Sequence, residues 1–208
     1  CGLVDFNEPK GGLNIFLNIK KDVDIILASS SPRRQELLKL ITHNFRTISS
    51  DIDETLPDDI YVENCAEYLA EKKAMEVYKK EKNSLIIGCD TVVVINNEIL
   101  GKPKDKNDAY EMLNKLSGKT HLVITGCCII YKNDKRLFKQ ITKVEMVNLT
   151  VSEIEEYILS KEPFDKAGGY AIQGKGALFI KGINGDFYNV MGLPVSCLNR
   201  ELKDIIGK

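Results

Sequence analysis

Asp90 is the strongest candidate for catalysis, because it interrupts the apolar run 85–95, LIIGCDTVVVI. Such a run, rich in β-branched residues, is typical of a buried strand. A carboxylate inside a buried strand is unfavourable unless it is paired, hydrogen-bonded or bound to a metal, so it is rarely kept for packing alone. Asp90 is therefore a candidate catalytic residue.

Two adjacent arginines indicate an anion site near the start of the chain. The stretch 25–34, IILASSSPRR, predicts a buried strand, a turn and a helix that begins at Pro32 with Ser31 as its N-cap. Arg33 and Arg34 then lie in the first helical turn, where backbone N–H groups and the helix dipole already favour an anion. Cations do not belong there as dipole partners, so we expect a polyanion between them. Solvated surface charges on an ordinary strand-turn-helix are the alternative.

A second cationic candidate, Lys73, comes from the amphipathic helix predicted over 62–80. Lys73 follows Leu69 by four residues and so shares the apolar face, unlike Lys72, which is expected in solvent. A lysine snorkelling at the edge of the apolar face is the alternative. The acidic loop 51–59 precedes this helix, and most such loops are simply solvated.

The remaining pattern predicts the scaffold. An Asn96–Asn97 turn predicts a hairpin into 98–100, and a helix follows with Asp105 or Asn107 as its cap. Long paired strands are expected over 121–131 and 137–149, then a helix with a Ser152 and Glu155 capping box, and a last helix over 198–206. His121 is expected to be structural.

The segment 165–194 holds seven of the fifteen glycines, which indicates positive φ angles or close backbone approach to a ligand.

Composition limits the function classes. The chain has 208 residues, 43% hydrophobic and 28% charged, as expected of a soluble globular enzyme. Lysine and arginine number 29 against 30 acidic residues, so no overall positive field indicates nucleic acid or an anionic membrane as partner. No apolar run is long enough to span a bilayer. Six cysteines without a C-x-x-C pair read as free thiols, and a cytoplasmic location is expected.

ASSSPRRQELL at 28–38 is the first of several ordered motifs. It resembles S-x-S-P-R-R-x-E-L-L, a pattern of the Maf family of nucleoside triphosphate pyrophosphatases. The family motifs L-A-x-x-K-A, A-D-T, G-K-P-x-D, D-K-A-G-x-Y-x-I-Q-G and N-V-x-G-L-P are matched in order at 69–74, 89–91, 101–105, 165–174 and 189–194, with Cys89 in place of the usual small residue. The resemblance covers about 24–206. Residues 1–22 are expected to be an N-terminal extension without assigned function, and 23–208 the enzyme domain.

The resemblance implies an α/β fold of the Maf and inosine-triphosphate-pyrophosphatase type, an elongated mixed twisted sheet flanked by helices, with two lobes and a central cleft. It also implies roles for nine residues. Asp90 and Glu54 would bind Mg²⁺ or Mn²⁺, with Asp90 also orienting the water, and Lys102 would act on the phosphates beside them. Asp53 remains a rival to Glu54, because the I-acid-E motif is short. The residues implied in substrate binding are Ser29, Arg33, Arg34, Lys73, Thr91 and Gln173.

The implied reaction is hydrolysis of a nucleoside triphosphate to monophosphate and pyrophosphate. The A-D-T and I-Q-G motifs resemble the family branch acting on dTTP and UTP, in a house-cleaning role for the nucleotide pool. Hydrolysis of other modified nucleotides such as 7-methyl-GTP is the alternative, as is a nucleotide- or nucleic-acid-binding regulator of cell division. Neither a nucleic acid nor a membrane is expected as partner, and the oligomeric state is open, with a homodimer among the choices.

Overall fold

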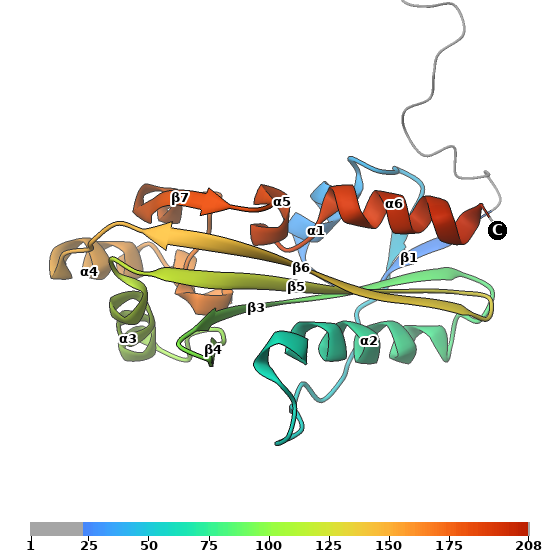
Figure 1. Ribbon diagram of the computed structural model, residues 1–208, viewed down its shortest axis with the longest axis horizontal. Coiled ribbons are helices and arrows are strands. Elements are labelled where there is room, and N and C mark those ends of the chain that lie inside the picture. Colours follow the sequence, from blue (N-terminus) through green and yellow to red (C-terminus); the bar gives the residue numbers. More distant parts are fainter. Residues whose placement is uncertain (1–22, 208) are drawn as a thin grey trace, which may run out of the picture.

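The computed structural model describes residues 23–207, and the expected extension 1–22 lies outside them. Figure 1 shows an elongated molecule in which three long strands of one sheet run along the major axis. The strands are β1 (Ile25–Leu27), β2 (Arg46–Thr47), β3 (Leu85–Ile95), β4 (Glu98–Leu100), β5 (Thr120–Tyr131), β6 (Asp134–Met146) and β7 (Ile180–Asn184). The expected α/β class with a mixed sheet is confirmed.

Helices lie on both faces of the sheet and at one end of it (Figure 1). The α-helices are α1 (Pro32–Leu38), α2 (Cys65–Tyr78), α3 (Lys106–Leu116), α4 (Val151–Leu159), α5 (Phe187–Val190) and α6 (Val195–Ile206). Short 3-10 helices are η1 (Val62–Asn64), η2 (Glu162–Asp165), η3 (Ala167–Gly169) and η4 (Lys175–Phe179).

The sheet order is β2-β1-β3-β5-β6-β7, with β4 paired to β3. β1 runs parallel to β2 and β3, whereas β3, β5, β6 and β7 form antiparallel pairs. β3 is therefore the strand at which a parallel half of the sheet joins an antiparallel half. Its burial along almost its whole length explains why its sequence is a continuous apolar run rather than an alternating one.

Two glycines let α2 approach one face of the sheet closely. A Cβ added to Gly88 on β3 would lie 2.3 Å from the Ala70 carbonyl oxygen, and one added to Gly126 on β5 would lie 2.3 Å from the backbone of Ala66. Any side chain at either position would push the helix away from the strands. The missing Cβ atoms thus fix how near the side chains of α2 come to those of β3.

The opposite face is covered by α1 and α6. Leu37, Leu38, Leu198 and Leu202 pack there with Cys89 of β3 in one buried cluster. A second cluster, built from α3, α4 and residues near η3, closes the other end of the molecule. Because side chains alternate along a strand, Asp90 points to the face of α2 and Thr91 to the face of α1.

Several local predictions are confirmed. Ser31 caps α1, since its Oγ accepts from the Arg34 N–H, and Asp105 rather than Asn107 caps α3. Asn96 and Asn97 have φ angles of 51° and 63°, as the tight β3–β4 turn requires. The expected capping box of α4 was wrong by two residues: Thr150 and Glu153 form it, because the helix begins at Val151.

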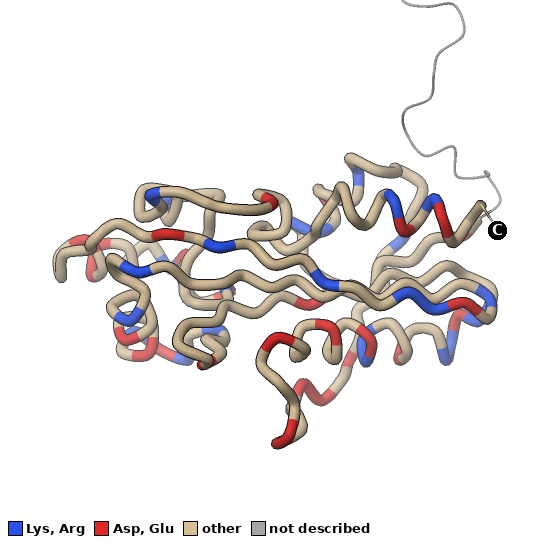
Figure 2. Tube along the Cα trace, viewed as in Figure 1, with Lys and Arg blue, Asp and Glu red and all other residues tan. Residues whose placement is uncertain are grey.

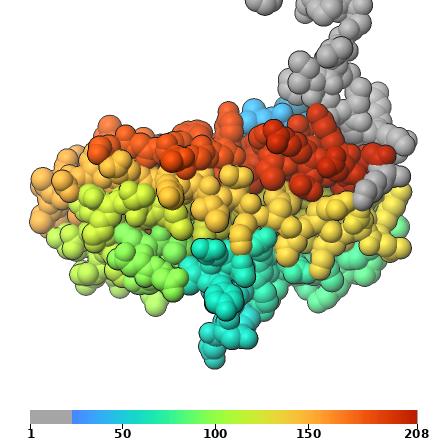
Figure 3. All heavy atoms as spheres, in the orientation of Figure 1, coloured from blue at the N-terminus to red at the C-terminus, as the bar shows by residue number. Residues whose placement is uncertain are grey.

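The acidic loop before α2 projects from the body of the molecule (Figures 2 and 3). Its acidic residues are exposed, as expected of a largely solvated loop. Within the described part of the chain, every helix is too short or too polar to cross a membrane.

Candidate active site

The site lies where the outer edge of β3 lacks a strand partner. β1 pairs with Leu85–Ile87 and β4 pairs with Val93–Ile95. Among the described residues, the five between, 88–92, pair only with β5 on the other side. The turn from β1 into α1 and the loop after β4 border this opening, so the Ser-Pro-Arg-Arg and Gly-Lys-Pro segments meet at the same stretch of β3.

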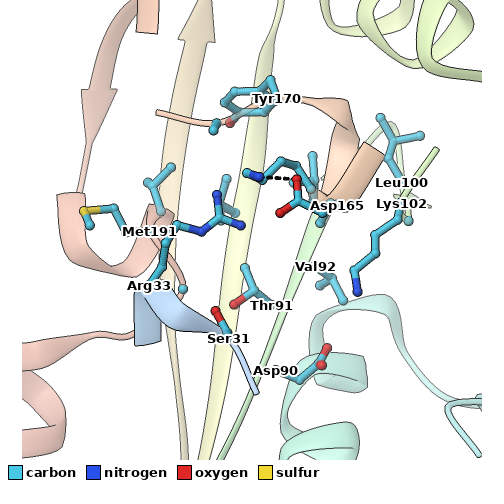
Figure 4. Close-up of a pocket in the computed structure, with 18 of the residues that line it drawn as sticks. Ser31, Arg33, Asp90, Thr91, Val92, Leu100, Lys102, Asp165, Tyr170 and Met191 are labelled. Carbon is cyan, nitrogen blue, oxygen red and sulfur yellow. Dashed lines mark hydrogen bonds and ion pairs between the residues drawn. The ribbon is translucent and has the colours of Figure 1, made fainter. Parts of the chain in front are cut away.

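Two adjoining cavities of about 450 and 400 Å³ fill the opening, and the larger lies within the range usual for small-molecule sites. Figure 4 shows residues of β3, α1 and the loops around the larger one. All nine residues predicted for the site line one cavity or both. Eight residues line both, which makes the cavities parts of one site: Ser31, Arg33, Arg34, Glu54, Lys73, Lys102, Asp165 and Lys166.

An ion-paired triad occupies the α2 side of the opening. The Lys73 Nζ lies 2.5 Å from Asp90 Oδ1 and 2.8 Å from Glu54 Oε1. Asp90 is only 8% exposed, so the ammonium supplies the pairing that a carboxylate in a buried strand requires. The hydrogen bond from Lys73 holds the pKa of Glu54 below its ordinary value, and the charges of Lys102 and Arg34 act in the same direction.

The structure distinguishes Glu54 from Asp53. The Asp53 carboxylate turns back to accept hydrogen bonds from the N–H and hydroxyl of Thr55, which lower its pKa, and it does not line either cavity. The Asp53 carbonyl oxygen accepts a hydrogen bond from Lys72 at 2.5 Å. Lys72 thus lies outside both cavities, where it ties the acidic loop to α2 through an exposed contact.

Arg34 occupies the α1 side of the opening and is held at three nitrogens. Its Nε donates to the Gly192 carbonyl oxygen at 2.9 Å, one terminal nitrogen to Ser29 Oγ at 3.4 Å, and the other to Thr91 Oγ1 at 3.0 Å. A guanidinium has five N–H groups. Two therefore remain for a ligand, in positions fixed by the other three.

A chain of hydroxyl groups continues from Arg34 across the sheet. Thr91 Oγ1 lies 3.0 Å from Thr125 Oγ1, which donates to the Asn189 carbonyl oxygen at 3.0 Å. Since the Thr125 proton is used on Asn189, the Thr91 proton must be used on Thr125, and Thr91 accepts from Arg34. Thr91 thus faces the cavity with no proton left to donate, and its clear structural role is to hold Arg34.

The other cationic residues line the rim. Arg33 and Lys102 border both cavities, as does Lys166, which forms an ion pair with Asp165. Burial acts against the charge of Asp165, but the hydrogen bond from Lys166 and the charge of Arg33 lower its pKa. The larger cavity is lined by five cationic side chains and three carboxylates, a formal excess of two positive charges suited to a polyanion.

One wall of the larger cavity is formed by the glycine-rich segment. Tyr170, Ala171, Ile172 and Gln173 line it, and the Gln173 side chain is exposed. Tyr170 is 5% exposed, and its hydroxyl oxygen lies 2.6 Å from Nε2 of His121. Burial lowers the pKa of His121 to about 4, so the ring is neutral at ordinary pH and lies behind the wall rather than in the cavity.

The donor set suits a hard divalent cation only when substrate oxygens complete it. No cluster of three or more carboxylate, histidine or cysteine side chains able to hold a metal is found in residues 23–207. Glu54 and Asp90 each contact the Lys73 ammonium through one carboxylate oxygen. The second oxygen of each carboxylate is the one that could bind a metal ion. Mg²⁺ is commonly held by one or two carboxylates together with phosphates and waters, so these two residues fit it.

Some site residues were not anticipated. Ser49, Ser50 and Lys166 line the smaller cavity, and Thr125 and Asn189 support Arg34 from the interior. Asn189 did lie within a matched family motif, but neither spacing nor residue type marked it or Thr125 as a support. Only the strand register, which places Thr125 opposite Thr91, shows it.

Fold and site together define an α/β protein with a cation-lined cleft. A family model described as Maf-like protein matches residues 24–205, and the chain belongs to this family.

Curated relatives match over most of their length. A protein of Clostridium botulinum (strain Okra / Type B1) named dTTP/UTP pyrophosphatase is 48% identical over 188 residues, which span 88% of this chain and 97% of the relative. A protein of the same name from Bacillus cereus (strain ATCC 14579) is 47% identical over 184 residues, 86% of this chain and 94% of the relative. The solved structure of the Staphylococcus aureus Ham1 protein matches 59% of this chain and 71% of its own at 18% identity, with a TM-score of 0.41, too low to add to the fold assignment.

Proposed function

We propose that the protein hydrolyses nucleoside triphosphates to the monophosphate and pyrophosphate, with dTTP and UTP as preferred substrates. The observation that carries the proposal is Asp90, a nearly buried carboxylate held by Lys73 where one edge of β3 lacks a strand partner, in a cavity lined by five cationic side chains. Family membership and the name shared by relatives at 47–48% identity support the same reaction.

In the proposed reaction, water attacks the α-phosphorus while the bond from that phosphorus to the α–β bridging oxygen breaks. The electron pair leaves with pyrophosphate, and Asp90 accepts the proton of the attacking water as general base. Lys73 orients the Asp90 carboxylate through its short contact with Oδ1. This contact fixes the direction in which the base meets the water.

Charge neutralisation is the second requirement, because a triphosphate carries several negative charges near the reacting phosphorus. Arg34 offers two N–H groups in fixed positions, with Ser29 beside it. Arg33, Lys73 and Lys102 add positive charge around the same cavities. Together these cations would bind the triphosphate along its length.

A divalent cation, Mg²⁺ or Mn²⁺, would be held by Glu54 and Asp90 together with phosphate oxygens. When bound, it supplies further positive charge on the phosphates. The lowered pKa of Glu54 keeps this carboxylate charged for that role.

Base selection is assigned to the glycine-rich wall. Gln173 carries both a donor and an acceptor, which suits the O4 and N3–H of a pyrimidine. A site that hydrogen-bonds a base edge discriminates strongly, because the wrong base leaves polar groups of the site unpaired.

We propose that the reaction takes place in the cytoplasm, because the five described cysteines are free thiols and a reducing compartment favours free thiols.

The test is pyrophosphate release from a panel of dTTP, UTP, CTP, ATP, GTP, inosine triphosphate and 7-methyl-GTP, with Mg²⁺ and with excess chelator. We expect the highest kcat/KM for dTTP and UTP, and loss of activity in chelator. A higher kcat/KM for 7-methyl-GTP or inosine triphosphate would overturn the base preference and leave the reaction class standing. Full activity in chelator would overturn the metal assignment.

A further inference from the structure

The segment that carries Gln173 is held from behind by two residues that do not line the cavity. Tyr157, on the last turn of α4, is 3% exposed and packs edge-on against Phe179 at 4.9 Å between ring centroids. Its hydroxyl donates to Glu162 Oε1 at 2.9 Å and accepts from the Ala171 N–H at 3.3 Å. The tyrosine thus joins the end of α4 to the start of the Gln173 segment.

Glu162 holds the other end of the same segment. Its Oε2 accepts from the Lys175 N–H and its Oε1 from the Gly176 N–H, both at 3.1 Å. Between these anchors and Ala171 lie three residues, 172–174, of which the middle one is Gln173. We call Tyr157 and Glu162 the loop clamp and residues 171–176 the clamped loop.

Two glycines of the clamped loop fit the clamp sterically. Gly174 has a φ of +117°, and a Cβ on it would lie 2.7 Å from a carboxylate oxygen of Glu162. A Cβ on Gly176 would lie 2.8 Å from the Tyr157 hydroxyl oxygen. The loop therefore comes as close to the carboxylate and the hydroxyl as backbone allows, at two separate points.

At neutral pH, Glu162 of the clamp is charged and Tyr157 keeps its proton, so the hydrogen bonds between them persist. Burial acts against the charge of Glu162, but the two backbone N–H groups and the Tyr157 hydroxyl lower its pKa, so it is ionised at neutral pH. Burial, together with the hydrogen bond to Glu162, raises the pKa of Tyr157, which keeps its proton. Hydrogen bonds to a charged acceptor are stronger than neutral ones, and all three here end on one carboxylate.

We propose that the loop clamp is a positioning device for base specificity: Tyr157 and Glu162 fix the clamped loop and thereby the place of Gln173 against the nucleotide base. This inference rests on the proposed function. It assigns no contact between the clamp and the substrate, because both residues lie outside the lining of the cavities.

The decisive variant is Glu162→Gln, which keeps the size of the side chain. Its NH₂ group cannot accept the hydrogen bonds that Tyr157, Lys175 and Gly176 donate to the carboxylate. The second variant, Tyr157→Phe, removes a single oxygen and keeps the ring packing. For both we expect the preference for dTTP over ATP, as a ratio of kcat/KM, to fall about tenfold, the scale of one lost hydrogen bond to a charged acceptor. The loss should come chiefly from a higher KM for dTTP rather than from kcat.

Coupling to Gln173 separates positioning from a general loss of structure. In a Gln173→Ala background, Glu162→Gln should change the preference less than threefold, because the residue through which it acts is gone. Matched controls are Glu145→Gln, whose carboxylate pairs with Lys181 on the surface, and Tyr78→Phe, whose hydroxyl donates to the Lys132 carbonyl oxygen. Both should leave the preference unchanged.

Hydrogen exchange of the full chain gives a readout that does not depend on turnover. The amides of Ala171, Lys175 and Gly176 should exchange faster in Glu162→Gln than in the unaltered protein. An unchanged dTTP preference in both clamp variants, or an equal loss in the Gln173→Ala background, would overturn the clamp while leaving the proposed function intact. If the unaltered protein releases pyrophosphate from no nucleotide, the proposed function falls and the specificity role falls with it.

Discussion

The two faces of β3 present different kinds of interaction to the same cavity. On the face toward α2, Asp90 is held by a charged partner, Lys73, which also reaches Glu54. On the face toward α1, Thr91 belongs to a chain of hydrogen bonds that ends on the backbone of Asn189, and its task is to hold Arg34. We call these the ionic face and the hydroxyl face.

The difference lies in how each face responds to loss of one member. On the ionic face, removing Lys73 takes away the ammonium that pairs with both carboxylates, which is strongly unfavourable for the nearly buried Asp90. On the hydroxyl face, a lost hydroxyl removes one of three bonds to Arg34, so the guanidinium keeps two anchors. The ionic face should therefore be sensitive to single changes, and the hydroxyl face tolerant of them.

The largest effect is expected at Asp90. Asp90→Asn should fold and still bind nucleotide but lose turnover by roughly 10²-fold or more, because the amide cannot accept the proton of water. Pyrophosphate release and nucleotide binding by calorimetry are the measurements, with Asp58→Asn on the exposed acidic loop as control. Near-normal turnover in Asp90→Asn would remove the base from the ionic face.

Lys73→Ala comes next, with an expected fall in kcat/KM of roughly 10-fold to 10²-fold, since both the carboxylates and the phosphates lose a cation. Lys79→Ala is the matched control, because Lys79, the C-cap of the same helix, has a side chain that is 66% exposed and pairs with Glu76 on the surface. Lys72→Ala should fall between them, since Lys72 holds the backbone of the acidic loop that carries Glu54. Equal effects at positions 73 and 79 would contradict the ionic face.

A smaller effect is expected on the hydroxyl face. Thr125→Val should lower kcat/KM about three- to tenfold, because Thr91 loses its acceptor and its hold on Arg34 loosens. Thr125→Ser should restore activity. If the valine variant loses as much in an Arg34→Ala background as it does alone, Thr125 does not act through Arg34.

The smallest effect on activity is expected at His121, because this residue lines neither cavity. Its effect is expected on stability instead. Its pKa in the folded protein, about 4, is below its ordinary value of 6.5, so between these values the unfolded chain binds a proton that the folded chain does not. Stability from this group is therefore complete above pH 6.5 and lost as the pH falls to 4, by about 3 kcal/mol. The free energy of unfolding of His121→Gln, measured by urea between pH 4 and 7, should show a shallower slope. Equal slopes would mean that the ring is solvated in the folded state.

Much of this arrangement was predictable, since it depends on local pattern. The apolar run around Asp90, the Ser31 cap and the position of Lys73 on the apolar face of its helix follow from periodicity and turn chemistry. The family motifs added Glu54, Lys102 and Gln173, and all three line the larger cavity. Their roles in catalysis and binding remain predictions.

The other half of the site depends on pairings between distant parts of the chain. Neither the opening between β1 and β4 nor the contact of Thr125 with Thr91 can be read from one segment, because strand register decides both. The capping box of α4 was misplaced for a simpler reason: two polar pairs of the same spacing overlap, Thr150 with Glu153 and Ser152 with Glu155. Spacing alone does not choose between them.

The close approach of α2 to the sheet at Gly88 and Gly126 has a practical consequence for mutational surveys. Replacing residues one by one with alanine is designed to delete interactions, and it ranks positions by what is lost. At these two glycines the same replacement adds an atom where the helix backbone lies 2.3 Å away, so it would lift α2 and carry Lys73 from Asp90. A survey would score both glycines as though they took part in the chemistry, although neither has a side chain to contribute.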